Sequence, residues 1–357
     1  MKKIDQLNGF LSLVLIIIMI SGCDPVTPTD DDLDGYVTPD DCDDNNYDIN
    51  PGVAEVCDDE LDNDCDGDID MADSNCGAVS CETTTDYIQC MDIPYKYIEG
   101  VDSNLLSLDV YTPKIDPLTN YPVLIYIHGG GWQSGDKSDV FHKDEYFTSK
   151  DFVFVSVNYR LTEVNGDHNG VMYPMHNQDV ASAVKWVYDN IENYKGDKSN
   201  LIILGHSAGG GIGAAITTDR RFLEAEDLSL NNIKCMISLD SSGLNITERI
   251  ENCYLMGQCE RFYNSFSPDD EDLWYKASPI NYIEPGIGIP TYFVITTGRT
   301  RLAYTEEFER ALGNQVLHDY EVLNQYHHIN IDTNLGESDE DKVTEEVKDF
   351  LDTYCVE

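Results

Sequence analysis

The chain has 357 residues, 41% of them hydrophobic, and its 67 acidic and 22 basic residues give a formal net charge of -45. That charge repels nucleic acid and anionic lipid headgroups, so we exclude both as partners. The length and the apolar content fit one large α/β domain together with a small module.

The N-terminus has the organisation of a secretory signal. Two lysines precede an apolar stretch over residues 10–20, which is too short to span a bilayer. The stretch ends in Ile20-Ser21-Gly22-Cys23, which resembles the lipobox of bacterial lipoprotein signal peptides. The resemblance implies cleavage of residues 1–22 and acylation of Cys23, leaving residues 23–29 as a linker from the lipid anchor to the protein. We therefore expect a location in the bacterial cell envelope; the alternative is a plain secretory signal.

Eleven cysteines are many for a cytosolic protein of this size and indicate an oxidising compartment. If Cys23 carries lipid, ten remain, an even number that is compatible with five disulfides. Spacing does not reveal their connectivity, although Cys253 and Cys259 are close enough in sequence for a local bridge.

Residues 30–80 have almost no core-forming pattern but repeat one acidic theme twice. In each repeat, aspartates occupy positions 1, 3, 5 and 12 of a calcium loop, and glycine occupies position 6, where it allows a sharp turn. Aspartate replaces the usual glutamate at position 12. The predicted metal ligands are Asp30, Asp32, Asp34, Asp41, Asp62, Asp64, Asp66 and Asp73.

The same module resembles a family of bacterial extracellular metal-binding repeats, through the segments 40–44, 50–52, 55–57 and 62–67. One type of member has been associated with copper, but an all-oxygen ligand set favours a hard cation, and we predict Ca²⁺. The alternative is a solvated acidic linker without a specific metal. In either case the module is expected to act as a stalk stiffened by Cys42, Cys57, Cys65 and Cys76.

From residue 92 to residue 357, short apolar runs alternate with helical periodicity, which predicts an α/β sheet domain. Strands are expected at residues 123–127, 152–157, 201–204, 235–239, 291–297 and 318–323, and helices at residues 179–188 and 304–312.

The third of these strands leads directly into Gly205-His206-Ser207-Ala208-Gly209, which has the form of a nucleophile elbow. Such a turn exposes the serine and needs minimal neighbours, so Ser207 is the candidate nucleophile. The glycine-rich loop after residues 123–127 supplies unobstructed N–H groups. We assign Gly130, Gly131 and Ala208 as oxyanion-hole donors.

Together, His128-Gly-Gly-Gly-Trp132, Tyr159-Arg160-Leu161 and the elbow resemble the esterase branch of the α/β hydrolases, over roughly residues 95–354. This branch includes hormone-sensitive-lipase-like esterases, feruloyl and acetyl-xylan esterases, and arylformamidases. The resemblance implies the α/β-hydrolase fold with an eight-stranded, mostly parallel sheet, and a Ser-Asp-His triad that works without a cofactor.

The triad histidine must lie near the C-terminus, where His327 and His328 stand together. We prefer His328, because relatives often carry His-x-x-Ile shortly before Leu-Gly, and residues 328–331 before Leu335-Gly336 fit that register. His128 and His206 belong to the glycine motifs and are expected to serve structure. The remaining histidines are interpreted as ordinary surface or loop residues: His142, His168, His176 and His318.

The triad acid is less obvious, because the turn after residues 291–297 reads Gly298-Arg299-Thr300-Arg301, where the family commonly has Asp. Asp240, at the end of an earlier strand, is the preferred replacement, and Glu306 is the alternative. The sequence thus predicts an extracytoplasmic serine carboxylic-ester hydrolase acting on a small-molecule ester. The competing hypotheses are a degenerate hydrolase-fold binding protein and an arylformamidase-like amide hydrolase.

Overall fold

The computed structural model describes residues 30–53, 61–67, 69, 81–98, 100–114, 120–163, 170–256 and 259–356. The chain forms two compact units, Met1–Cys76 and Gly77–Glu357. Several sequence-based predictions lie outside the described residues: the signal segment with Cys23 and its linker, the bridging roles of Cys57 and Cys76, Asp73 and His168.

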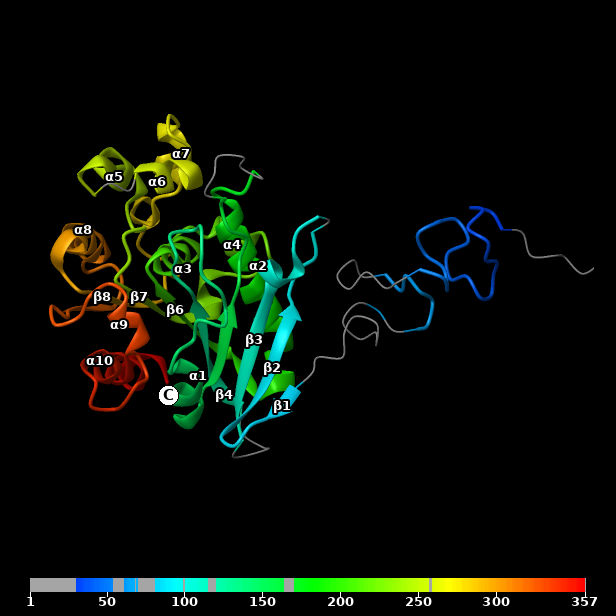
Figure 1. Ribbon diagram of the computed structural model, residues 1–357, viewed down its shortest axis with the longest axis horizontal. Coiled ribbons are helices and arrows are strands. Elements are labelled where there is room, and N and C mark those ends of the chain that lie inside the picture. Colours follow the sequence, from blue (N-terminus) through cyan, green and yellow to red (C-terminus); the bar gives the residue numbers. More distant parts are fainter. Residues whose placement is uncertain are drawn as a thin grey trace, which may run out of the picture. The chain divides into compact units, whose positions relative to one another are not determined.

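The larger unit is built on one sheet with the strand order β1-β2-β3-β5-β4-β6-β7-β8-β9 (Figure 1). From β5 to β9 neighbouring strands run parallel, whereas the pairs among β1, β2, β3 and β5 are antiparallel. The strands are β1 (Cys81–Thr83), β2 (Tyr87–Pro94), β3 (Ser107–Pro113), β4 (Tyr121–Ile127), β5 (Val153–Val157), β6 (Gly196–His206), β7 (Ile233–Leu239), β8 (Thr291–Thr296) and β9 (His318–Val322).

The described residues form nine strands, one more than the resemblance implied. The additional strand is β1, which extends the antiparallel edge and is held to β2 by paired backbones and by the disulfide Cys81–Cys90. A three-residue strand of exposed residues has no apolar pattern, so nothing in the sequence predicted it.

Helices cover both faces of the sheet. The α-helices are α1 (Lys143–Ser149), α2 (Met175–Asn190), α3 (Ala208–Thr218), α4 (Arg221–Glu224), α5 (Ile246–Glu251), α6 (Cys259–Phe266), α7 (Glu271–Lys276), α8 (Leu302–Leu312), α9 (Asn330–Thr333) and α10 (Lys342–Phe350). The shorter turns are η3 (Ser103–Leu106), η4 (Ile191–Tyr194), η5 (Leu230–Asn232), η6 (Cys253–Met256), η7 (Pro279–Tyr282), η8 (Arg299–Arg301) and η9 (Leu351–Cys355).

Side chains of β4 alternate between the two hydrophobic clusters that lie on opposite faces of the sheet. Val123 and Ile125 pack into a cluster with residues of α2 and α3, whereas Leu124 and Tyr126 pack on the opposite face with residues of α1 and α10. Because both faces are covered, the strand is a continuous apolar run rather than an alternating one. The short apolar runs in the sequence were therefore a reliable signal for the central strands.

The interpretation of His176 as a surface or loop histidine was wrong. Helix α2 begins four residues earlier than the predicted start at Asp179, and His176 lies on its buried face with its Nε2 3.0 Å from the hydroxyl of Thr162. His142 is exposed, as expected, next to the first turn of α1. His318 is half-buried in β9.

Four disulfides join described cysteines. Cys253–Cys259 is the predicted local bridge, and Cys42–Cys65 lies within the smaller unit. Cys235–Cys355 ties β7 to the C-terminal turn across 120 residues, and Cys81–Cys90 spans 9. Among the described residues, no helix has both the length and the apolar character needed to cross a membrane.

Two disulfides of the larger unit whose closed loops differ widely in length form a matched pair for a stability test. Because a longer closed loop restricts the unfolded chain more, replacing Cys235 and Cys355 by alanine should lower the free energy of unfolding by about 2 kcal/mol more than replacing Cys81 and Cys90. Denaturant titration of the full chain measures both losses. Equal losses would contradict the loop-length explanation.

Candidate active site and metal-binding loops

Ser207 stands in the turn between β6 and α3, with a backbone φ of 54° and ψ of −114°. Non-glycine residues rarely adopt such a conformation, so the turn is held by its surroundings. A Cβ atom on Gly205 would lie 2.4 Å from the carbonyl oxygen of Gly209, and one on Gly209 would lie 2.1 Å from that of Ile127. Only glycine fits at these two positions, which explains the Gly-x-Ser-x-Gly spacing.

The structure brings Ser207, His328 and Asp240 into one chain of hydrogen bonds. Ser207 Oγ is 2.9 Å from His328 Nε2, and His328 Nδ1 is 2.7 Å from Asp240 Oδ2. Because an ionised carboxylate only accepts hydrogen bonds, Nδ1 donates and Nε2 is left to accept from the serine hydroxyl. This is the geometry of a serine nucleophile with its general base.

Asp240 is fully buried directly after β7. Its second oxygen, Oδ1, accepts hydrogen bonds from the Thr297 N–H at 2.8 Å, from the Thr297 hydroxyl at 3.1 Å and from the Thr296 hydroxyl at 3.0 Å. Burial by itself would raise the pKa of Asp240, but the hydrogen bond to His328, the charge of Arg301 and the Thr297 N–H together lower it to about 2. The carboxylate is therefore ionised at neutral pH.

Glu306 and His327, the two alternatives from the sequence, are exposed and lie outside this chain of hydrogen bonds. Glu306 is exposed on α8, and His327 is exposed beside the candidate histidine, with its N–H bound to the side chain of Asn330. In place of the acid expected after β8 stands Arg301, whose Nε is 3.7 Å from Asp240 Oδ2. The turn after β8, which lacks the usual acid, therefore places a positive charge next to Asp240.

The glycine loop after β4 lies against the serine. A Cβ atom on Gly129 would come within 3.2 Å of Ser207 Cβ, and Gly130 and Gly131 follow with positive φ values of 111° and 63°. The loop is supported by Tyr159, whose ring stacks on His128 at 4.5 Å and whose hydroxyl donates to the His128 carbonyl at 3.2 Å. Ala208, the third predicted donor, is the first residue of α3.

A buried polar network beside His328 was missed by sequence reasoning. The Nε2 of His206 is 2.8 Å from the carbonyl oxygen of His328, and its Nδ1 is 3.6 Å from Asp332. Asp332 in turn accepts from the Tyr126 hydroxyl at 2.9 Å and pairs with buried Lys143 at 3.0 Å. Burial lowers the pKa of His206 to about 4, so the ring is neutral and can donate one hydrogen bond to the His328 backbone.

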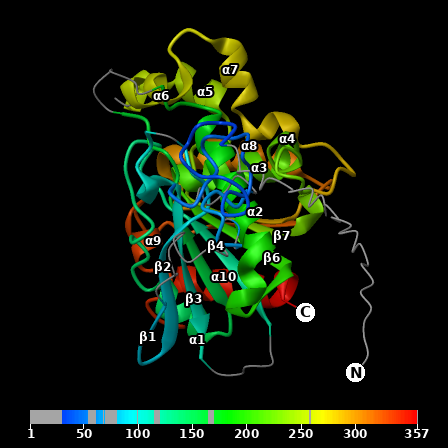
Figure 2. The same ribbon diagram turned by 90° about the vertical axis from the view of Figure 1, so that its right-hand side faces the viewer.

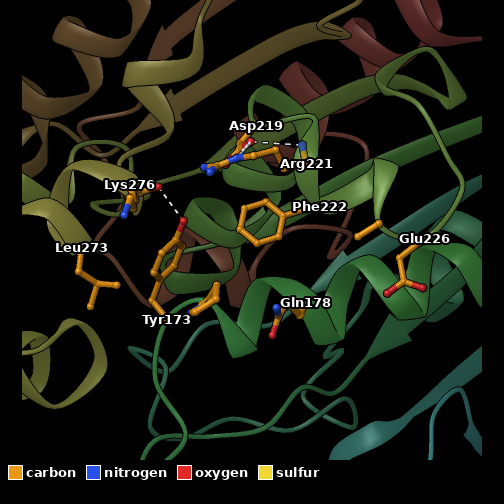
Figure 3. Close-up of a pocket in the computed structure, with 10 residues that line it drawn as sticks. Tyr173, Gln178, Asp219, Arg221, Phe222, Glu226, Leu273 and Lys276 are labelled. Atoms are coloured by element: carbon orange, nitrogen blue, oxygen red, sulfur yellow. Dashed lines mark hydrogen bonds and ion pairs between the residues drawn. The ribbon is translucent and has the colours of Figure 1, made fainter.

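Two of the hollows on the larger unit differ in their position relative to the triad. One, of about 240 Å³, borders the glycine loop and is lined by Gly129, Gly130, His206 and Ile329 among others. The other, of about 310 Å³, lies among α2, α4 and α7 and is lined by Tyr173, Phe222 and the Asp219–Arg221 ion pair among others (Figure 3). Of these two, only the first is lined by chain neighbours of triad residues, namely His206 and Ile329.

In the smaller unit the two predicted loops share one local geometry. Gly35 and Gly67 have φ values of 101° and 99°, and their N–H groups donate at 3.1 Å to the first aspartate of each loop, Asp30 and Asp62. Ligand oxygens gather within 4.8 Å of one another in three groups: Asp32, Asp34 and Asp41; Asp30, Asp32 and Asp44; and Asp62, Asp64 and Asp66.

These groups fit a bound cation. In the first two groups, four oxygens are buried without a hydrogen-bond partner: Asp30 Oδ1, Asp32 Oδ2, Asp34 Oδ2 and Asp41 Oδ2. Buried carboxylate oxygens that lack donors are unfavourable unless a cation neutralises them. Desolvation and repulsion by neighbouring aspartates raise the pKa of Asp32. A cation bound beside Asp32 would oppose both effects. Asp44 was not predicted as a ligand.

The strand order, the serine turn and the paired histidine and carboxylate define an α/β-hydrolase-fold protein. The family model BD-FAE matches residues 108–299, more than half of the 357 residues, and the chain belongs to that family. A second model, Cu-binding_MopE, described as "Putative metal-binding motif", matches residues 41–71 in the smaller unit.

Curated relatives match over part of their length. Esterase B1 of Culex pipiens is 33% identical over 109 residues, which is 29% of this chain and 20% of the relative. The para-nitrobenzyl esterase of Bacillus subtilis is 28% identical over 153 residues, covering 40% of this chain and 29% of the relative. The chain therefore spans less than a third of the length of these relatives.

Solved structures share the fold. Esterase B from Lactobacillus rhamnosis superposes with a TM-score of 0.60 at 17% identity, covering 77% of this chain and 87% of that one. A truncated carbohydrate esterase from gut microbiota gives 0.59 at 15% identity, covering 77% and 97%. At these identities the likeness concerns the fold alone.

The choice of acid and histidine can be tested with matched substitutions. We expect Asp240→Asn to lower kcat for ester hydrolysis by about 10⁴, because the wrong imidazole tautomer would then face Ser207. Glu306→Gln, an equal change on an exposed carboxylate, should leave kcat within about twofold. The same contrast is expected between His328→Gln and His327→Gln. Steady-state kinetics measure all four, and a large loss in Glu306→Gln would reassign the acid.

Proposed function

We propose that the protein is a serine carboxylic-ester hydrolase that acts outside the cytoplasm. The observation that carries the proposal is the unbroken chain from Ser207 through His328 to buried, ionised Asp240. The esterase names among its relatives and the BD-FAE family membership support the same reaction class.

In the proposed mechanism, His328 Nε2 takes the proton of Ser207 as Oγ attacks the carbonyl carbon of the ester. The N–H groups of Gly130, Gly131 and Ala208 hold the oxyanion, and loss of one such donor costs about 3 kcal/mol of barrier. The tetrahedral intermediate collapses, and His328 returns the proton to the departing alcohol.

Deacylation repeats these steps with water. His328 takes a proton from the water as its oxygen attacks the acyl-enzyme carbonyl, and then returns that proton to Ser207 Oγ as the carboxylic acid leaves. Asp240 stays ionised throughout and stabilises the imidazolium that forms in each half-reaction. The network of His206 and Asp332 fixes the backbone that carries His328, so the base keeps its position.

The hypothesis of a degenerate scaffold lost its main argument with the position of Asp240. That hypothesis depended on the missing carboxylate after β8. Asp240, at the end of β7, makes the hydrogen bond to His328 that such a carboxylate would make. The hypothesis of an amide hydrolase is distinguished from that of an ester hydrolase by comparing the rates of hydrolysis of matched ester and formamide substrates.

For localisation, we propose a bacterial envelope protein whose Cys23 carries a lipid anchor. The lipobox-like segment supports this, and four disulfides between described cysteines favour an oxidising compartment. For the smaller unit we propose Ca²⁺ as the bound ion, since all ligands in the three aspartate groups are oxygens.

The nucleophile assignment predicts that Ser207→Ala lowers hydrolysis of 4-nitrophenyl acetate by about 10⁴ or more while the protein stays folded. Ser199→Ala removes an exposed hydroxyl at the start of β6 and should leave the rate within about twofold. A colorimetric assay with circular dichroism on both variants measures the outcome. Retained turnover in folded Ser207→Ala protein would reject the assignment.

The metal assignment predicts that the full chain binds Ca²⁺ and is stabilised by it against unfolding. Asp32→Asn should weaken the binding at least tenfold, because Asp32 belongs to two of the aspartate groups. Asp48→Asn makes the same charge change at an exposed residue of the module and should not. Calorimetric titration decides, and equal affinity in both variants, or tighter binding of Cu²⁺ than Ca²⁺, would contradict the assignment.

A further inference from the structure

Positive side chains are scarce in this protein, and nearly all of the described ones have partners. In the part of the chain that the structure describes, each lysine and arginine except Arg261 and Arg299 makes a hydrogen bond, an ion pair, a ring contact or another electrostatic contact. With 67 acidic residues in the chain, cations without any of these contacts are unexpected. Both arginines are exposed, and Arg299 lies in the turn directly after β8, beside the strand end that carries Asp240.

Arg261 lies on α6 against the glycine loop. A Cβ atom built on Gly131 would meet Arg261 Cδ at 2.5 Å and Nη1 at 2.7 Å, so the guanidinium group covers the bare face of that glycine. Gly131 is one of the three predicted oxyanion donors. The cation therefore stands at the rim of the space where the ester carbonyl would bind.

Packing fixes this position. Phe262, the next residue, meets Trp132 of the glycine loop with ring centroids 5.6 Å apart, and Phe266 meets the same ring at 4.8 Å. The disulfide Cys253–Cys259 closes the turn in front of α6. Figures 1 and 2 show α5, α6 and α7 as one group, so Arg261 belongs to a small helical cap rather than to a loose loop.

Further arginines add positive charge on the same side. The Arg249 guanidinium group lies over the rings of Phe262 and Tyr304, at 5.2 Å and 5.1 Å. Its charge also acts on Arg301, the residue that contacts Asp240. Long-range repulsion by the net charge of -45 is screened beyond about 8 Å at physiological salt, so charges close to the triad matter more than the net charge for an anion that binds there.

We propose that the natural ester substrate carries a carboxylate, and that Arg261 binds it at the rim of the oxyanion loop. The inference rests on the proposed ester hydrolysis and names its substrate class. A guanidinium group matches a carboxylate with two parallel hydrogen bonds.

The test uses two pairs of esters that differ only in charge. 4-Acetoxybenzoate and its methyl ester place the carboxylate on the alcohol side. The 4-nitrophenyl monoester of adipic acid and its methyl ester place it on the acyl side. For each pair, the ratio of kcat/KM for the anionic ester to that for the neutral ester is measured in wild type, R261Q, R261K and R220Q. Comparing ratios between variants cancels the intrinsic reactivity of each ester.

We expect R261Q to lower the ratio at least about tenfold in one pair, as for loss of a charge-assisted hydrogen bond. R261K should restore part of it, and added salt should lower the wild-type ratio. R220Q removes an exposed cation paired with Glu224 on α4 and should keep the wild-type ratio. An unchanged ratio in R261Q for both pairs would overturn the inference and leave the proposed ester hydrolysis intact.

A binding measurement separates the two proposals. If wild type hydrolyses none of the four esters, that result contradicts the proposed ester hydrolysis but does not bear on the role of Arg261. Calorimetric binding of 4-hydroxybenzoate and of its methyl ester still tests Arg261 in the same proteins. Tighter binding of the anion in wild type, lost in R261Q, would support the inference, and equal affinities in wild type and R261Q would overturn it.

Discussion

The hydrogen bond between His328 and Asp240 is the interaction on which the rest of the site depends. It sets the tautomer of the imidazole, and the tautomer decides whether the nitrogen facing Ser207 can accept a proton. The carboxylate itself is held by Thr296, Thr297 and the nearby charge of Arg301. The strained serine turn positions a nucleophile, but without this hydrogen bond the nucleophile would have no oriented base.

The order of β7 and β8 in the sheet explains why the acid can come from either strand end. The strands are parallel neighbours, so Asp240 after β7 and the Gly298 turn after β8 meet at the same edge. The N–H of Asp240 donates to the Ile295 carbonyl at 2.8 Å, and the N–H of Thr297 donates to the carboxylate. A chain with arginine after β8 can therefore keep the same hydrogen bond from one strand over, and the arginine then supports the ionised acid.

Sequence-based prediction was most precise for site residues that lie in one contiguous motif. The serine turn and the glycine loop are contiguous motifs whose glycines are required by close backbone approach, and both were predicted residue by residue. The acid was a choice between Asp240 and Glu306, because it depends on two strand ends that meet only in the folded chain. The pair of Lys143 and Asp332, 189 residues apart, had no local signal at all. The further candidate ligand Asp44 was missed for the same reason, since an irregular loop folds it back beside Asp30.

The most direct test of the central claim is reaction of the intact protein with a fluorophosphonate, followed by mapping of the modified peptide. The account predicts a single adduct on Ser207, formed rapidly in wild type and lost in His328→Ala protein that remains folded. Such a result would show that His328 activates this serine. No adduct in folded wild-type protein, or equal labelling in His328→Ala, would contradict the account and leave a hydrolase fold without a working nucleophile.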